Sequence, residues 1–366
     1  MKQDWKYLNF EDCLEKVVYT TKILSKDYLS DGEFPIVSQE EGLISGYWNK
    51  REDLFRLKKP VVLFGDHTRV LKYVDFDFVI GADGVKILQP IEQLFAKFLY
   101  YFLQWYKVPS LGYSRHYKLL KEITVPIPPV EEQKEICSLL DKMNRVIEAK
   151  KVQLKELDNL AQAIFYDMFG DPVTNTKGWK ISTIDNISTD KLSYGSGASA
   201  VEYDGQTRYV RITDINDLGD LNEDIKSPSE FDEKYLLREG DILFARSGAT
   251  VGKTYCHSEK NGRCIYAGYL IKMRPDKSMV MPKYVFYYTK SEYYKAFIRN
   301  AQNAVAQPNI NAKQYGGLAI PVPPLPLQQA FAEKVEAIER QKELINQSIK
   351  DVQTLFDAKM DYYFGD

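Results

Sequence analysis

An internal repeat constrains the fold of this 366-residue chain more than any other feature. The segment ITVPIPP at residues 123–129 returns as LAIPVPP at residues 318–324, so that Pro126 corresponds to Pro321, 195 positions later. The offset persists downstream, where Phe-Gly-Asp at residues 169–171 returns 195 positions later at the end of the chain. Such self-similarity indicates two copies of one structural unit.

The two halves also begin alike, because Trp5-Lys6 corresponds to Trp179-Lys180 at an offset of 174 positions. The change from 174 to 195 means that the first half lacks about 21 residues between its start and its proline-rich junction. Each half is therefore predicted to consist of a variable block followed by a constant block. The boundaries are expected at 1–127 and 173–322 for the variable blocks, and at 128–172 and 323–366 for the constant blocks.

Each constant block is predicted to be one long helix. Prolines at 128 and 129 disfavour a helix before them, and the acidic residues at 131 and 132 suit a helix N-terminus. Apolar residues then recur at three- and four-residue spacing over Glu131–Met168 and again from about Leu327 to Tyr363. Two such rods are expected to pack on each other as an intramolecular coiled coil. The alternative is that each rod packs on its own variable block. The residues expected to form the packing and partner-binding stripes are Ile136, Leu140, Met143, Ile147, Leu154, Leu157, Val335, Ile338, Ile345, Ile349 and Val352.

The variable blocks are predicted to be mixed α and β, since short runs rich in Val, Ile and aromatic residues alternate with Gly-rich connectors. The expected strands are Val61–Phe64, Phe76–Ile80, Val85–Leu88, Thr207–Thr213, Asp241–Arg246 and Cys264–Arg274, and the expected helices are Ile91–Lys107 and Tyr284–Arg299.

One segment imitates a nucleotide-binding motif. Ser247–Thr254 reads SGATVGKT, but only three residues separate Gly248 from Gly252, where a phosphate-binding P-loop has four between its glycines. The residues that follow do not begin a helix, so we expect no ATP site. No other segment supplies a nucleophile or an adenine-methyltransferase motif, and the chain is predicted not to be an enzyme.

Metal chemistry is not indicated either. Cys256, His257 and Cys264 lack the spacing of a metal site, and we expect no metal ion. Asp75 and Asp77 alternate with phenylalanines, which predicts the solvent face of a half-buried strand and not a nuclease centre.

The overall composition places the chain in the cytoplasm. A hydrophobic content of 44% supports real cores, yet no apolar run approaches the ~20 residues of a membrane span, and the N-terminus is too polar for a secretory signal. Four cysteines without regular spacing suit a reducing compartment.

The proline-rich junctions that open the long helices, PPVEEQ at 128–133 and PPLPLQ at 323–328, carry a resemblance to a known family. The segments FGDHTR at 64–69, VIGADGVK at 79–86 and GDILFARSG at 240–248 agree with it. In this order and duplication, the whole chain resembles the specificity subunit of type I restriction-modification systems. The second junction departs from the pattern by lacking the Glu-Glu pair of the first.

The resemblance implies a function and a set of partners. Each variable block would be a target recognition domain that reads one half of a bipartite sequence in double-stranded DNA. The two helices would pack antiparallel, set the spacer between half-sites and hold two methyltransferase subunits, with restriction subunits completing the complex. S-adenosylmethionine, ATP and Mg would be cofactors of those partners, and this chain would bind none. Lengthening the Glu131–Met168 helix by one turn is then expected to lengthen the spacer.

Candidate DNA contacts are polar or cationic side chains on expected loops, since such groups read base edges and phosphates. In the first block they are Tyr47, Trp48, Asn49, Lys50, His67, Thr68, Arg69, Lys72, Ser114, Arg115, His116 and Lys118. In the second block they are Arg246, Ser247, Thr250, Lys253, Gln302, Asn303, Gln307, Asn309 and Asn311.

The charge of −2 conceals an uneven distribution. The variable blocks carry net charges of +1 and +3, whereas each constant block carries −3. Such weak positive charge predicts that the isolated chain binds DNA poorly and that its partners supply much of the phosphate contact.

Three other functional interpretations of the sequence remain open. The chain could serve a related system with one fused methyltransferase-nuclease partner, or act as a coiled-coil adaptor that does not recognise DNA. It could also be a nuclease or methyltransferase itself, which methyl transfer or cleavage by the purified chain would reveal.

Overall fold

The computed structural model describes residues 5–303 and 309–365, except for the side chain of residue 303, and it divides into two compact units. The first unit combines residues 1–151 with 346–366, and the second comprises residues 152–345. Both long helices contribute to both units, so neither unit corresponds to one continuous half of the sequence.

The two predicted long helices are present, each within two residues of its expected limits. Helix α3 spans Val130–Phe169 and helix α7 spans Leu325–Phe364, and both contain 40 residues. At ~1.5 Å per residue, each is about 60 Å long.

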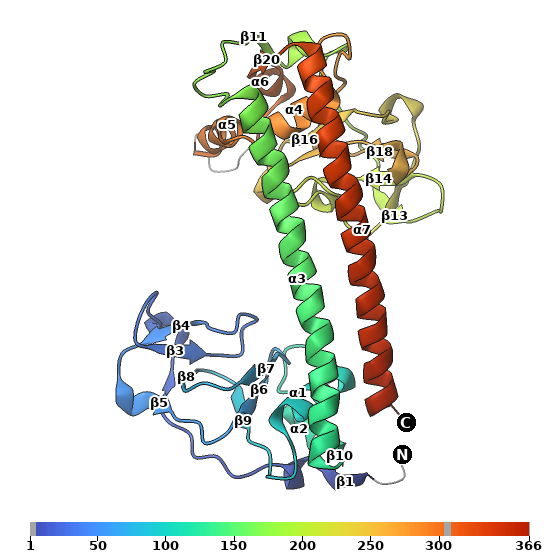
Figure 1. Cartoon of the computed structure of the whole chain (residues 1–366). Coiled ribbons are helices and arrows are strands. Elements are labelled where there is room, and N and C mark those ends of the chain that lie inside the picture. Colours follow the sequence, from blue (N-terminus) through green and yellow to red (C-terminus); the bar gives the residue numbers. More distant parts are fainter. Residues whose placement is uncertain (1–4, 304–308, 366) are drawn as a thin grey trace. The chain divides into compact units, whose positions relative to one another are not determined.

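Within each unit, the beginning of one long helix lies with the end of the other (Figure 1). In the first unit, Phe356 and Phe364 near the end of α7 join the same core as Leu140 near the start of α3. In the second unit, Phe169 at the end of α3 packs on Phe331 near the start of α7, with ring centroids 5.2 Å apart. The helices therefore form the expected antiparallel pair.

Burial along the predicted packing stripes varies with position on the helices. Ile136, Leu140, Ile147, Val335 and Ile338 are buried. The remaining members are partly exposed: Met143, Leu154, Leu157, Ile345, Ile349 and Val352. The helix ends are covered both by the partner helix and by the variable block of the same unit, so both predicted modes of packing contribute.

One pair of antiparallel strands closes each variable block, called a domain from here on, and explains the two repeat offsets. Strand β1 (Lys6–Asn9) pairs with β10 (Thr124–Ile127), and β11 (Lys180–Thr183) pairs with β20 (Ala319–Val322). Lys6 lies opposite Ile127, and their counterparts Lys180 and Val322, at offsets of 174 and 195, also lie opposite each other. The two halves therefore share the same register, and the length difference falls inside the domains.

Each domain contains an antiparallel hairpin sheet. In the first, β6 (Val61–Gly65) lies between β7 (Leu71–Val74) and β9 (Val85–Leu88), beside helix α1 (Ala96–Tyr106). The second has the strand order β12-β19-β16-β17, with helices α4 and α5 following the sheet in the chain. These elements are β12 (Ser193–Tyr194), β16 (Ile242–Ala245), β17 (Thr254–Cys256), β19 (Leu270–Met273), α4 (Pro282–Tyr288) and α5 (Glu292–Asn303).

The remaining elements are short and differ between the domains. In the first they are β2 (Lys22–Ile23), β3 (Phe34–Val37), β4 (Gly46–Trp48), β5 (Leu54–Phe55), β8 (Phe78–Gly81) and α2 (Tyr117–Leu120). In the second they are β13 (Ala200–Glu202), β14 (Arg208–Val210), β15 (Lys226–Pro228), β18 (Cys264–Tyr266) and α6 (Ala312–Gly316). Strands β2 to β5 and β8 form one sheet, and β14 pairs in parallel with β18.

Two expected elements are each divided in the structure. The strand predicted at Cys264–Arg274 is β18 and β19, separated by a turn in which the Leu270 N–H donates to the Ala267 carbonyl (2.8 Å). The helix predicted at Tyr284–Arg299 is α4 and α5, because the Thr289 hydroxyl donates to the Phe286 carbonyl (2.6 Å) where α4 ends.

Three other elements are shorter than predicted. Helix α1 begins at Ala96 and not at Ile91, strand β8 begins at Phe78, and β14 ends at Val210. After β14 the chain enters a 3₁₀ turn, in which Arg211 and Asp214 form an ion pair (2.6 Å).

A buried glutamine attaches each long helix to its domain. The Gln133 Oε1 accepts a hydrogen bond from the Phe95 N–H (2.7 Å), and its Nε2 donates to the carbonyls of Gln93 (2.8 Å) and Pro128 (2.7 Å). Its counterpart 195 positions later makes the same three kinds of bond. Gln328 accepts from Met281 N–H (2.8 Å) and donates to the carbonyls of Met279 (3.2 Å) and Pro323 (2.8 Å). The repeated glutamine therefore satisfies backbone groups at the domain–helix junction.

No helix within the described ranges is both long enough and apolar enough to cross a membrane.

Candidate nucleic-acid interface

The principal candidate residues lie on structurally equivalent loops of the two domains. The loop at 66–70 joins β6 to β7, and the loop at 246–253 joins β16 to β17. Both follow the strand that pairs with two neighbours in the hairpin sheet. The sequence predicted these two loops separately, and the structure places them at the same point of the fold.

The segment before each proline-rich junction meets this loop through one backbone hydrogen bond. The His116 N–H donates to the Asp66 carbonyl, and the Ile310 N–H donates to the Arg246 carbonyl, both at 2.8 Å. Asp66 and Arg246 are each the first residue after the central strand. We call the first assembly surface 1 (residues 66–70 with 113–118) and the second surface 2 (residues 246–253 with 309–311).

Arg246 is the most defined side chain of surface 2. Its Nε donates to the Asn309 Oδ1 (3.1 Å), and its guanidinium lies 4.7 Å from the centroid of the Tyr194 ring. The Tyr194 hydroxyl in turn accepts from the Ala312 N–H (3.1 Å). A guanidinium has five N–H donors, and the bond to Asn309 uses one of them. The group is thus fixed in position while it keeps donors for a base edge or a phosphate.

Two tyrosines of this region were not among the predicted contacts. Tyr194 supports Arg246, and Tyr269, whose side chain is 62% exposed, accepts a bond from the Arg246 N–H through its carbonyl (3.1 Å). Tyr194 precedes Gly195, and Tyr269 follows Gly268. An aromatic residue next to a glycine in a polar connector is the sequence signal that could have identified both tyrosines.

The other predicted residues of surface 2 have mixed roles. The Thr250 hydroxyl donates to the Ser247 carbonyl (3.2 Å), which shapes the loop. Lys253 pairs with Asp217 (3.0 Å), and the Asn311 Oδ1 accepts from the Gln314 N–H (2.9 Å) as the N-cap of α6. Gln302 lies on α5 and is half-buried, whereas Gln307 and the side chain of Asn303 lie outside the described residues.

Surface 1 is built around a stacked ring pair. His67 stacks on Tyr113, with centroids 5.8 Å apart and an interplanar angle of 20°, and the Tyr113 side chain is fully exposed. The Thr68 hydroxyl donates to the Gln39 carbonyl (2.7 Å), and Arg69 donates from Nη1 to the Val108 carbonyl (3.1 Å). The last predicted members are Ser114, which is half-buried, and Arg115 and Lys118, which are exposed.

Two predicted contacts are buried and do not face solvent. His116 is 1% exposed, its Nε2 accepts from the Leu111 N–H (3.0 Å), and its Nδ1 therefore donates to the Asp66 carbonyl (3.0 Å). Lys72 is 5% exposed and its ammonium donates to the Gly42 carbonyl, while burial lowers the pKa of the amine. Both residues hold loops in place, so we remove them from the proposed DNA contacts.

The residues predicted at Tyr47–Lys50 belong to another sheet. Tyr47 lies on β4 and exchanges backbone hydrogen bonds with Leu29 (2.9 and 3.1 Å). The Trp48 indole donates to Asp53 (2.9 Å), and Asn49 accepts from the Glu33 N–H (3.0 Å). Lys50 lies 5.8 Å from the Trp48 ring and is exposed. The bonds of the first three residues stabilise this sheet.

A cationic group beside surface 1 was missed by sequence reasoning. Burial lowers the pKa of Lys22, and the nearby charges of Lys86 and Arg115 lower it further. Lys86 lies 5.3 Å from the Tyr117 ring centroid and 4.0 Å from an Asp66 carboxylate oxygen. Strand residues far apart in the sequence supply Lys22 and Lys86, which explains why no local pattern identified them.

The two surfaces differ at their equivalent position. Asp66 of surface 1 is buried, and its carboxylate accepts from the Tyr117 N–H (2.8 Å), whereas Arg246 of surface 2 is half-buried and its Nε donates to Asn309. The same backbone arrangement therefore carries a buried acid on one surface and a partly exposed cation on the other.

The segment SGATVGKT leads into a strand, because β17 begins at Thr254, whereas the lysine of a P-loop opens a helix. Among the residues that the structure describes, no group of three or more His, Cys, Asp or Glu side chains is arranged to hold a metal ion. Asp75 and Asp77 lie between β7 and β8 and not on the predicted strand, and Asp77 accepts from the Leu57 N–H (2.8 Å).

Comparison with known proteins agrees with the duplicated architecture. A family model described as the type I restriction modification DNA specificity domain matches twice, at residues 2–159 and 176–354. The chain is 22% identical to the type I restriction enzyme MjaVIII specificity subunit of Methanocaldococcus jannaschii, over 96% of this chain and 92% of the relative. It is 23% identical to the EcoR124I/EcoR124II specificity subunit of Escherichia coli, over 96% and 91%.

The fold has also been observed before. The crystal structure of the S subunit of a type I restriction-modification system from M. genitalium superposes with a TM-score of 0.61 at 14% identity, covering 99% of this chain and 96% of the other. Because the family model covers both repeats and nearly the whole sequence, the chain belongs to the type I restriction-modification DNA specificity family, with two copies of its domain.

Proposed function

We propose that this chain directs a type I restriction-modification complex to a bipartite target in double-stranded DNA. Surface 1 reads one half-site and surface 2 reads the other, mainly through exposed polar side chains on their hairpin loops. The observation that carries the proposal is the equivalence of the two surfaces, which share one backbone arrangement but expose different side chains, the His67–Tyr113 ring pair on surface 1 and Arg246 on surface 2. Duplicated readers with different side chains suit a target with two unlike halves.

The chain acts in this proposal as a cytoplasmic, non-catalytic subunit. Its long helices dock two methyltransferase subunits, which use S-adenosylmethionine to methylate adenine, and restriction subunits that use ATP and Mg complete the endonuclease. The structure supports a helical docking face, because apolar side chains such as Leu344 (72% exposed) and Val152 (59% exposed) lie on the outer surface of the helices.

Adenine-methylation sequencing tests this proposal directly. A host without other adenine methyltransferases should express the chain together with a methyltransferase subunit of a type I system from the same source. The expected result is one methylated motif with two defined halves and an undefined spacer. A host that expresses the methyltransferase alone should show no such motif, and a motif without a spacer would contradict the bipartite proposal.

The helices are expected to set the spacer length. Inserting seven residues after Lys150 in α3 and seven after Ile345 in α7 preserves the apolar stripe and adds about 10 Å to each helix. At about 3.4 Å per base pair, the methylated motif should gain roughly three undefined base pairs. A length-neutral replacement of the same helical turns is the control, and an unchanged spacer in the insertion variant would disprove the role of the helices as a ruler.

A further inference from the structure

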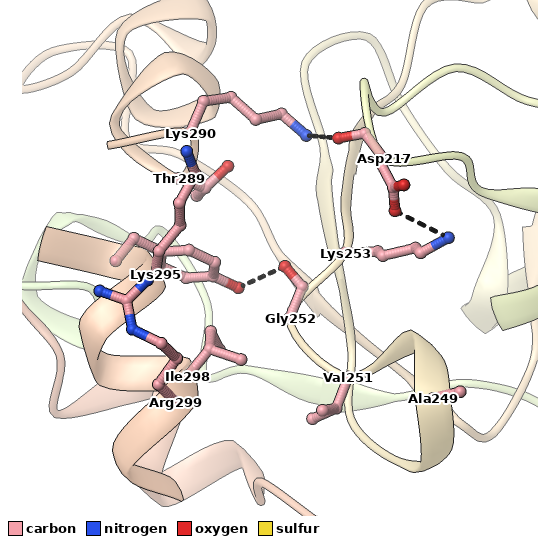
Figure 2. Close-up of a pocket in the computed structure, with 11 residues that line it drawn as sticks. Asp217, Ala249, Val251, Gly252, Lys253, Thr289, Lys290, Lys295, Ile298 and Arg299 are labelled. Atoms are coloured by element: carbon pink, nitrogen blue, oxygen red, sulfur yellow. Dashed lines mark hydrogen bonds and ion pairs between the residues drawn. The ribbon is translucent and has the colours of Figure 1, made fainter. Parts of the chain in front are cut away.

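A cationic cavity of about 320 Å³ lies beside surface 2 (Figure 2). It opens between the loop that follows β16 and the segment from the end of α4 into α5. Val251, Tyr294 and Ile298 form apolar parts of its wall. The charged residues that line it are Asp217, Lys253, Lys290, Lys295 and Arg299.

Asp217 lies between two of the lysines. Its carboxylate pairs with the Lys253 ammonium (3.0 Å), and its main-chain carbonyl accepts from the Lys290 ammonium (3.2 Å). In Figure 2 both lysine side chains extend toward Asp217 from different segments. The Asp217 side chain is 89% exposed, so it stands at the solvent side of the cavity.

Positive charge exceeds negative charge among the residues that line this cavity, where four cationic side chains face the one carboxylate of Asp217. Three carboxylates lie nearby outside the lining: Glu292 pairs with Lys295 (2.8 Å) and Arg299 (3.6 Å), and Asp158 and Asp220 act on Lys290. Burial lowers the pKa of Lys290 to about 8, which means that the nearby carboxylates do not fully offset the cost of burying its charged ammonium. A bound anion would offset the remaining cost.

One wall of the cavity is bonded to the loop at 246–253 of surface 2. The Tyr294 hydroxyl donates to the Gly252 carbonyl (3.1 Å), and Gly252 adopts a positive φ of 87°. A Cβ at this position would lie 2.8 Å from Ile298, so glycine allows the loop to lie directly on α5. An anion held at Lys253 would therefore be bound by the same short loop that begins with Arg246.

We propose that this cavity holds one phosphate of the DNA backbone next to the half-site read by surface 2, and that Asp217 occupies the phosphate position in the free protein. The inference rests on the proposed function and adds the phosphate contact of that same site. DNA is favoured over free phosphate because the cavity is open to solvent and is lined by the loop that begins with Arg246. Displacement of the Asp217 carboxylate by a phosphate would exchange one anion for another at Lys253 and bring a negative charge to Lys290, which now binds only the Asp217 carbonyl.

Removal of the Asp217 charge provides the first test. Asp217→Asn keeps the carbonyl that Lys290 binds and removes only the competing carboxylate, so DNA affinity of the assembled methyltransferase complex should rise about three- to tenfold at low salt. Glu202→Gln is the matched control, because Glu202 forms a similar exposed pair with Lys226 (2.7 Å). Equal affinities for Asp217→Asn and wild type would overturn the role given to Asp217.

Removal of one cation provides the second test. Arg299→Gln, at a side chain that is 58% exposed, should reduce the slope of log affinity against log salt by about one. Replacing single phosphates next to the second half-site by neutral methylphosphonates should reveal one position at which wild type loses affinity and the Arg299→Gln complex does not. Absence of such a position would overturn the proposed contact.

Free phosphate and pH separate the remaining explanations. If inorganic phosphate binds the complex in calorimetry and Arg299→Gln abolishes that binding, yet phosphate weakens DNA binding no more than chloride at equal ionic strength, the cavity is a site for free phosphate and the DNA assignment is wrong. Arg299-dependent competition between phosphate and DNA is the result expected from the proposal.

Lys290 faces Asp217, Asp220, Lys295 and Asp158, and its ammonium is present below and lost above pH 8. Affinity should thus fall between pH 7 and pH 9 in wild type and less in Lys290→Gln.

Failure of this inference can be distinguished from failure of the proposed function. A wild-type complex that discriminates its bipartite target, with salt slopes unaffected by the cavity variants, would leave the function in place and overturn the cavity. A wild-type complex that binds target and altered DNA equally would instead overturn the function.

Discussion

The substitution Gln133→Met is expected to destabilise the first unit by about 3–5 kcal/mol. Methionine approximates the length of glutamine but removes three hydrogen bonds, leaving the Phe95 N–H and two carbonyls without their buried partner. For a unit of this size, the corresponding unfolding transition should fall by about 10 °C. Calorimetry or urea unfolding measures the change, and faster amide exchange at Phe95 would locate it.

The repeat supplies a second variant and a control for this prediction. Gln328→Met should destabilise the second unit by a similar amount, because Gln328 makes the equivalent bonds. Gln347→Met serves as the control, since Gln347 is exposed on α7 and bonds only locally to Asp351 (2.8 Å). If all three variants unfolded alike, the junction glutamines would have no special role.

The substitution Arg246→Ala is expected to abolish discrimination at one half-site. A bidentate contact between arginine and a base is worth about 1–3 kcal/mol, so affinity for the correct second half-site should fall by about tenfold to a hundredfold. Discrimination at the half-site read by surface 1 should be unchanged. The measurement compares binding of the assembled complex to DNA altered in either half-site.

Arg263→Ala is the matched control for Arg246→Ala. Its guanidinium also lies over an aromatic ring, 4.1 Å from the Phe231 centroid, but belongs to the segment before β18. Arg263→Ala should retain discrimination at both half-sites. Equal loss of discrimination at both half-sites in Arg246→Ala would contradict the assignment of Arg246 to one of them.

The long helices could be predicted from the sequence because their signals are local and repeated. Proline before the first turn, apolar residues at helical spacing and a glycine after the end all lie within one segment. The strand at Cys264–Arg274 was predicted without its break because aromatic and β-branched residues favour strand on both sides of Gly268. The break depends on a turn hydrogen bond, which residue preference does not reveal.

The candidate surfaces could be predicted in part. The hairpin loops were identified because polar and glycine residues follow buried strands. Burial of His116 and Lys72 could not be anticipated, since their partners lie 50 and 30 residues away. The positions of Lys22, Tyr194 and Asp217 likewise depend on pairing between distant segments, which the order of residues does not show.

The interleaving of the two long helices has a consequence for the newly made chain. The first unit needs Phe356, Met360 and Phe364 to cover the aromatic face of α1, yet these residues are translated more than 240 positions after α1 ends at Tyr106. At about 5–20 residues per second, the 195 residues between Phe169 and Phe364 take roughly 10–40 s to synthesise. During that interval Phe98 and Trp105 lack the C-terminal side chain that they contact in the finished protein. The unit that is translated first is therefore completed after the second unit, and a chain truncated before Phe356 should be a preferred substrate for chaperones and proteases.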